Sequence, residues 1–293
     1  MLRPSLIAVT VLLCMLPSCG RTQDNTPPAN AQVTTGAGAV DTVKTRQLKK
    51  RLLGTLDKVA TTVKASKDTS DADRIANASY ATFKALAALA RAWDPKGEFS
   101  AMIDAEERNF IREDSTRKGK AGKILNGTLG MHAMYKILYS MRYAGNEARM
   151  HAVDSMDAAI TRKMQSGAQG IAIVAVAANN VYGMVRAIIE DMDREQFFAG
   201  HLEQVGQVYA EGAGSAQTDE DRFLNGLYRT FEVSQVWALM LEPKQRTALS
   251  EMNRQLIGRT RQREGVGNQM ASGMEFLYTI TAYITRTTID RSL

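Results

Sequence analysis

The spacing of apolar residues is the feature that most limits what this chain of 293 residues can fold into. Leu48, Leu52, Leu56, Val59 and Val63 recur at steps of three and four residues, which places them on one face of an α-helix. The same spacing returns in most later segments, whereas the period of two that marks a half-buried strand is almost missing. The sequence therefore predicts an all-α fold.

The helical body is expected to cover residues 43–293 as a single, multi-helix, bundle-like domain. An apolar fraction of 44% and a charged fraction of 23% are typical of a globular protein, and the length suffices for a large hydrophobic core. Apolar spacing, helix caps and glycine or proline breaks together predict ten helices. Their expected ranges are 43–68, 70–93, 99–113, 124–143, 146–165, 169–193, 195–211, 219–241, 244–263 and 266–288.

Alternatives to this architecture remain open at three points. Residues 276–285 alternate apolar side chains with threonine and could pair as a strand with residues 171–176, although a stable sheet needs further strands. No repeat of fixed period is apparent, which leaves a solenoid without support. Residues 170–189 are the most apolar segment, but a charged Arg186 inside a membrane would cost roughly 2.5–3.5 kcal/mol. We therefore expect a buried helix there rather than a membrane span.

The first 20 residues have the organisation of an export signal. One positive charge precedes an apolar run over residues 6–16, which is too short to cross a bilayer of roughly 30 Å. The run ends in Leu16-Pro17-Ser18-Cys19-Gly20, which resembles the lipobox of bacterial lipoproteins. The resemblance implies that residues 1–18 are a signal peptide and that Cys19 becomes the lipid-modified first residue. The alternative is an ordinary secretory signal with a chance cysteine.

Residues 19–42 are predicted to be a lipidated cysteine followed by a flexible tether. Small, polar and turn-forming residues dominate, with no apolar period. Such a chain has an end-to-end distance of about 25–30 Å. The next segment, residues 43–68, carries many lysines and arginines around its apolar stripe. This basic helix could press on an anionic membrane, or its stripe could pack into the core and leave the charges in water; we favour the second interpretation.

Charge and cysteine content limit the classes of partner. The formal net charge is +6, a mild excess that suits anionic surfaces. Basic clusters interleaved with stacking aromatics are missing, so we expect no nucleic-acid partner. Both cysteines, Cys14 and Cys19, lie in the first 20 residues, which leaves no pair for a disulfide in the mature chain.

A polar face on the most apolar helix is the first candidate ligand site. Asn179, Arg186 and Glu190 share this face, and Arg186 and Glu190 have the four-residue spacing of a helical ion pair. One interpretation places these residues at the floor of a ligand cleft. The other is a buried helix whose polar groups are satisfied by its neighbours.

A metal site and an apolar groove are further possibilities. Glu147, His151 and Asp154 lie at i, i+4 and i+7 of one expected helix, where an imidazole flanked by carboxylates could bind a divalent metal. An exposed polar face explains the same pattern. The 15 methionines fit a core or an adaptable apolar groove, and a copper site is a weaker alternative. Neither a phosphate-binding loop nor a nucleophilic-serine turn is present, and no cofactor is expected.

These observations together predict a lipid-anchored protein of the bacterial cell envelope, facing the periplasm or the exterior. Gly20 after the lipobox cysteine favours the outer membrane. The expected function is non-enzymatic: binding or scaffolding of an envelope protein or an apolar ligand. A helical hydrolase or a metal-dependent enzyme acting on envelope material is the alternative.

Overall fold

The computed structural model describes residues 42–66, 69–262 and 265–293. Within these ranges the chain forms ten α-helices and one short 3-10 turn and contains no strand, which confirms the all-α, bundle-like prediction. The two segments considered as strands, 171–176 and 276–285, both lie inside helices. The predicted signal peptide, Cys19 and the predicted tether as far as residue 41 lie outside the described residues.

The helices alternate between long and short along most of the chain. Their bounds are α1 Thr42–Ala65, α2 Asp71–Trp93, α3 Ser100–Thr116, α4 Gly119–Tyr143, α5 Glu147–Gln165, α6 Gly170–Met192, α7 Ala199–Ser215, α8 Asp219–Leu241, α9 Arg246–Gln262 and α10 Val266–Ser292, with the 3-10 turn at Pro243–Gln245. Two helix starts follow the expected capping chemistry. Ser70 caps α2, and Thr218 forms a capping box with Asp221 at the start of α8.

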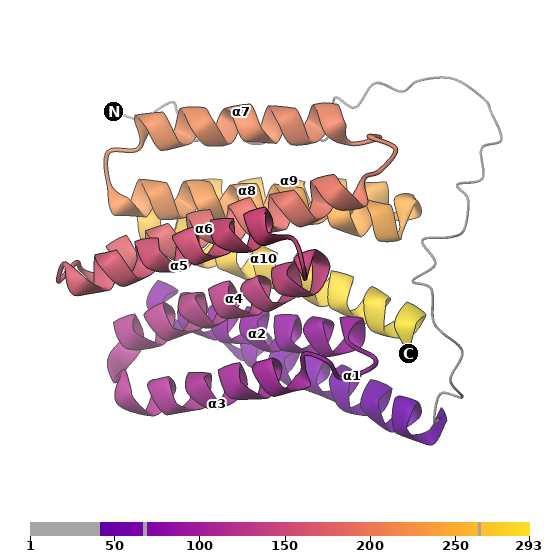
Figure 1. Cartoon of the computed structure of the whole chain (residues 1–293). Coiled ribbons are helices and arrows are strands. Elements are labelled where there is room, and N and C mark those ends of the chain that lie inside the picture. Colours follow the sequence, from indigo (N-terminus) through magenta and orange to yellow (C-terminus); the bar gives the residue numbers. More distant parts are fainter. Residues whose placement is uncertain (1–41, 67–68, 263–264) are drawn as a thin grey trace.

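Five inner helices close into a ring. Helix α2 contacts α4, α4 contacts α6, α6 contacts α8 and α8 contacts α10. Helix α10 in turn contacts α2, which closes the ring. The other helices lie outside this ring: α1 packs on α2, α3 on α4, α5 on α6, α7 on α8 and α9 on α10. Figure 1 shows the result from the side, with α7 and α3 at opposite edges and the inner helices between them. Short connections make successive helices antiparallel, so the inner helices all run in one direction.

Large side chains fill the centre of the ring. Trp93 of α2 and Trp237 of α8 belong to helices that are not neighbours in the ring, yet their rings lie 5.2 Å apart. Trp237 and Tyr135 of α4 are fully buried. Burial raises the pKa of Tyr135 to about 12, and the hydroxyls of Thr281 and Ser234 lower it only in part. The ring is therefore a packed core and not a channel.

The structure reveals an internal repeat of 99 residues that the sequence analysis missed. Helices α2 and α3 have the same lengths as α6 and α7, and each begins 99 residues before its counterpart. The turns that follow α2 and α6 are also alike. Asp94 accepts the backbone N–H groups of Glu98 and Phe99 at 2.8 and 2.7 Å, and Asp193 accepts those of Phe197 and Phe198 at 3.0 and 2.7 Å.

Side-chain contacts repeat at the same interval. Asn126 donates to the carbonyl of Phe110 at 3.1 Å, and Asn225 donates to that of Tyr209 at 2.9 Å. The stacked rings of Phe83 and Phe110 have centroids 4.1 Å apart, and so do those of Tyr182 and Tyr209. The clearest local signal of the repeat in the sequence is the tripeptide Leu-Asn-Gly at 125–127 and again at 224–226.

The glycines of this tripeptide are required where inner helices cross. A Cβ atom on Gly127 would lie 2.5 Å from the Cβ of Ser79 on α2, and one on Gly226 would lie 3.0 Å from the backbone of Ala178 on α6. The small residues let the backbones approach closely, so the same position of the repeat forms a helix crossing in both copies.

Helix α6 is long and apolar enough, by length and composition alone, to cross a membrane. Its position in the fold gives it a different role. It packs between α4 and α8 in the ring, and over half of its most apolar stretch is buried inside the protein. This arrangement is that of a core helix, as the sequence analysis expected.

Candidate functional site

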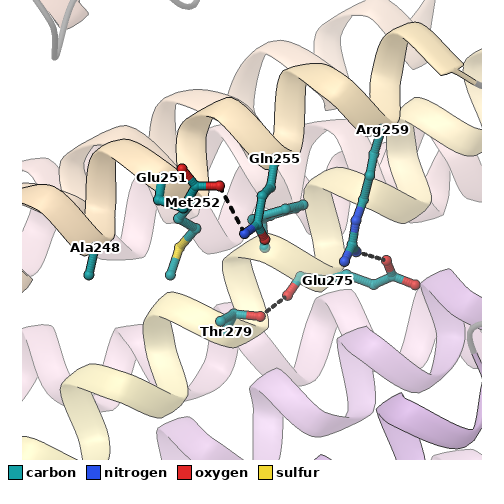
Figure 2. Close-up of a pocket in the computed structure, with 8 residues that line it drawn as sticks. Ala248, Glu251, Met252, Gln255, Arg259, Glu275 and Thr279 are labelled. Atoms are coloured by element: carbon teal, nitrogen blue, oxygen red, sulfur yellow. Dashed lines mark hydrogen bonds and ion pairs between the residues drawn. The ribbon is translucent and has the colours of Figure 1, made fainter.

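A pocket between α9 and α10 is the best-formed candidate site in the described part of the chain (Figure 2). Its volume is about 290 Å³, at the lower end of the range for small-molecule sites. Helix α9 contributes one wall and α10 the other. The lining residues are Ala248, Glu251, Met252, Gln255, Arg259, Glu275, Phe276 and Thr279.

A buried carboxylate lies at one end of this pocket. Glu275 is only 5% exposed and accepts two hydrogen bonds from Arg74 of α2, at 2.8 and 3.0 Å. Arg259 of α9 donates a third at 3.3 Å, as Figure 2 shows. Arg74 is itself buried and also donates to Asp71 and Asn268. The hydrogen bonds from Arg74 to Glu275 raise the pKa of that arginine, which keeps both charges in place.

The remaining surface of the pocket is partly apolar. Met252 and Phe276 provide apolar surface, and the guanidinium of Arg259 lies 5.1 Å from the centre of the Phe276 ring. Gln255 donates to Glu251 at 3.3 Å across one turn of α9. An apolar group could therefore enter between α9 and α10, with amide and guanidinium groups beside it for hydrogen bonds.

The predicted polar face of α6 lies in a different place, against α7 and α8. Asn179 accepts a hydrogen bond from Tyr209 of α7 at 2.9 Å and donates to the carbonyl of Arg222 on α8 at 3.2 Å. Arg186 donates to Glu190 at 2.6 Å and to Tyr182 at 3.2 Å. The structure thus brings the three predicted residues together on one seam. None of them lines the pocket between α9 and α10.

The repeat explains why this seam is polar. Phe83 and Phe110 of the first copy become Tyr182 and Tyr209 in the second, and these tyrosines gain hydroxyl partners on α6. A Cβ on Gly206 of α7 would lie 2.1 Å from Arg186, so the missing side chain there makes room for the guanidinium. The geometry favours the second sequence interpretation, in which neighbouring residues satisfy the polar groups of α6.

The three predicted metal-binding residues, Glu147, His151 and Asp154, lie on the exposed face of α5. Among the described residues no group of three or more histidine, cysteine or acidic side chains is close enough to hold a metal ion. The methionines are dispersed. Met131 and Met134 are buried in the core, and Met252 lines the pocket.

Two buried groups outside the pocket have strongly shifted pKa values. Burial raises the pKa of Glu232 to about 7, although Arg229, three residues before it on α8, donates to it at 2.6 Å. Burial lowers the pKa of His132 on α4 to about 4, and Asp157 on α5 offsets this only in part. Both groups are sealed in the core, so we assign them to the stability of the fold and not to a site.

The pocket residues were not found from the sequence, and only one local signal points to them. Arg259 and Glu275 come from different helices, and Arg74 lies 201 residues before Glu275. A glutamate amid the apolar residues of the last helix, at 274–277, was the available hint that a cationic partner is needed. The sequence does not show which arginine is this partner, because Arg74 of α2 meets Glu275 only where α10 packs against α2.

The fold and pocket define a ring of helical hairpins with a small surface pocket at its last hairpin. Comparison with known proteins finds no matching family model, no matching curated protein and no matching solved structure.

Proposed function

We propose that this protein is a lipid-anchored, non-enzymatic binding module of the bacterial envelope. The observation that carries the binding function is the pocket between α9 and α10, where apolar surface lies beside Gln255 and Arg259. The lipid anchor rests on the apolar run and the Leu-Pro-Ser-Cys-Gly sequence that ends at residue 20.

The ligand that suits the pocket is an apolar group with a hydrogen-bonding atom at its edge. A volume of about 290 Å³ admits a small apolar ligand or one bulky side chain of a protein partner. The Glu275 carboxylate accepts hydrogen bonds from Arg74 and Arg259, and so holds Arg259 at the pocket. The guanidinium of Arg259 is then placed to donate a hydrogen bond to the ligand.

The pocket is tested with the apolar dye 1-anilinonaphthalene-8-sulfonate, whose fluorescence rises in apolar sites. Ala248 is exposed and lines the pocket, so Ala248→Trp places a large ring over the opening without entering the core. We expect the dye to bind the wild type and the Kd to rise at least about tenfold in this variant, because the apolar surface is covered.

The matched control is Ala152→Trp, at an exposed alanine of α5, a helix that contributes no lining residue to the pocket. This variant is expected to bind the dye as the wild type does. Equal binding by the wild type and both variants would place the dye elsewhere and overturn the assignment of the pocket.

The anchor is tested by the intact mass of the protein purified from a bacterial host. The wild type is expected to begin at Cys19 and to carry the added mass of two or three acyl chains, the number that stable anchoring requires. Cys19→Ala removes the acyl mass, whereas the control Cys14→Ala retains it. A wild type cleaved elsewhere and free of acyl groups would refute the lipoprotein assignment.

A further inference from the structure

Helix α1 carries all of the net charge of the chain. It contains seven lysines and arginines and one aspartate, a net of +6, which equals the formal charge of the whole protein. The remaining residues therefore hold 30 basic and 30 acidic side chains. The other outer helices range from α3, with five acidic and two basic residues, to α9, with four basic residues and one acidic residue. Helix α1 is therefore the most basic of the described helices.

The basic side chains of α1 are on its solvent face. Leu52, Leu56, Val59 and Val63 are buried against α2 and α10, on the opposite side of the helix. The exposed basic residues of α1 are Lys44, Arg46, Lys50, Arg51, Lys58 and Lys64.

Two ion pairs in the described part of the chain join α1 to α10. Asp57, the one acidic residue of α1, is paired with Arg286 of α10 at 2.6 Å. Lys49 is half-buried and paired with Asp290 at 3.0 Å. Neither pair involves the six exposed basic residues of α1.

Burial of the apolar stripe determines how α1 can meet a membrane. An amphipathic helix that inserts into a bilayer must bury its apolar side chains among the lipids. In this protein those side chains are already buried in the domain, so insertion would require α1 to leave the core. Contact through the charged outward face requires no such change.

The position of α1 along the chain brings this face close to the membrane. Only 22 residues separate Cys19 from Thr42, the first residue of α1. Even fully extended, this segment spans no more than about 80 Å. Lysines and arginines near a surface of anionic lipid are attracted to it within a Debye length.

We propose that the outward face of α1 is an electrostatic docking surface for the anionic phospholipid bilayer. The surface acts in addition to the lipid anchor: its nearness to the bilayer rests on the proposed anchor at Cys19, whereas its attraction to anionic lipid rests on the charges of α1 alone. Docking through α1 would hold the domain in one orientation, with α1 toward the lipid and the remaining outer helices directed elsewhere.

The test uses the unlipidated chain from residue 20 onward, which retains every residue that forms the described core. Its binding to phosphatidylcholine vesicles is compared with binding to vesicles containing 30% phosphatidylglycerol, by sedimentation. We expect binding to the anionic vesicles only, with a loss of at least about tenfold between low and high salt. Because Cys19 is removed, this result is independent of acylation.

Two charge-reversal variants locate the surface. Lys50→Glu/Arg51→Glu changes an adjacent exposed pair on α1, and Arg162→Glu/Lys163→Glu changes an adjacent exposed pair on α5 by the same net charge. We expect the α1 variant to lose at least about tenfold in binding to anionic vesicles, and the α5 variant to stay within about twofold of the wild type. Circular dichroism checks that both variants are folded.

Equal losses in the two variants would show that total charge drives adsorption and would overturn the docking surface. Absence of binding to anionic vesicles at low salt would overturn it as well. Either result leaves the acylation test of Cys19 unaffected, so failure of the docking surface and failure of the anchor are distinguishable.

Discussion

His132 illustrates how a single buried residue ties stability to pH. The imidazole is 4% exposed on α4, and its Nε2 atom has no hydrogen-bond partner among the described residues. Burial disfavours the charged form, and Lys136 adds to this effect, whereas Asp157 opposes it from α5. The net result is a pKa of about 4 in the folded protein, against an ordinary value of 6.5.

Acidification is therefore expected to destabilise the fold through His132. As the pH falls below 6.5, His132 of the unfolded chain takes up a proton that the folded protein does not bind. The contribution of neutral His132 to the free energy of unfolding is therefore complete above pH 6.5 and is lost as the pH falls toward 4. The full loss is about 3 kcal/mol. Urea unfolding of the wild type and His132→Gln between pH 7 and pH 4 measures it as the difference between the two proteins.

Taking the difference removes the contribution of other titrating groups. Glu232 has a raised pKa, so its contribution has the opposite sign: stability is highest at low pH and falls as the pH rises toward about 7. This contribution is common to both proteins and cancels. Parallel pH profiles for the wild type and His132→Gln would contradict the assignment.

At the scale of elements, the two copies of the repeat share the turns that start their outer helices. Asp94 and Asp193 each accept two successive backbone N–H groups just before α3 and α7. The third residue after each aspartate has a positive φ, 77° at Gly97 and 56° at Gln196. The aspartate stabilises this turn because it satisfies donors that would otherwise lack partners at a helix start.

Removal of either aspartate is expected to weaken the fold by a similar amount. Asp94→Ala and Asp193→Ala should each lower the free energy of unfolding by about 1–2 kcal/mol, because two charge-assisted hydrogen bonds are lost. Asp114→Ala, at an exposed position near the end of α3, is the matched control and should stay within about 0.5 kcal/mol of the wild type. Chemical unfolding measures all three. A large effect in only one copy would show that the turns are not energetically equivalent.

At the scale of the whole molecule, closure of the ring supplies the buried partner of the carboxylate at the end of the pocket. Helix α10 contacts α2, and the buried hydrogen bonds from Arg74 to Glu275 lie at this closure. The same carboxylate holds Arg259 at the pocket. Helix α1 is the most basic of the described helices and contributes no lining residue to the pocket, so the membrane surface and the ligand pocket that we propose lie on different helices.

Several elements could be predicted from the sequence because their causes are local. The stripe of Leu52, Leu56, Val59 and Val63 is buried as expected, and Ser70 and Thr218 cap the helices that they precede. Helix bounds were predicted wrongly where contacts with residues distant in the sequence determine them. The fourth helix was expected to begin at residue 124, but α4 begins at Gly119, where Lys120 donates to Ser70 and Asp73 at the start of α2.

The candidate site could be predicted only in part. Asn179, Arg186 and Glu190 do share one face of a helix, as their spacing requires, but the face packs against α7 and α8. Spacing along one helix shows which residues are neighbours on its surface and not what covers them. The glycine at 206, which admits Arg186, lies on another helix.

The sequence by itself determined that this chain is helical, where most helices begin, and that its N-terminus resembles a lipoprotein signal. Each of these rests on contacts within about four residues, whose periodicity is visible in the chain. Only the tertiary structure decided the closed ring, the 99-residue repeat and the partnership of Arg74 with Glu275. Contacts across some 200 residues leave no periodic trace in the sequence, because they depend on how packed helices fill a common core.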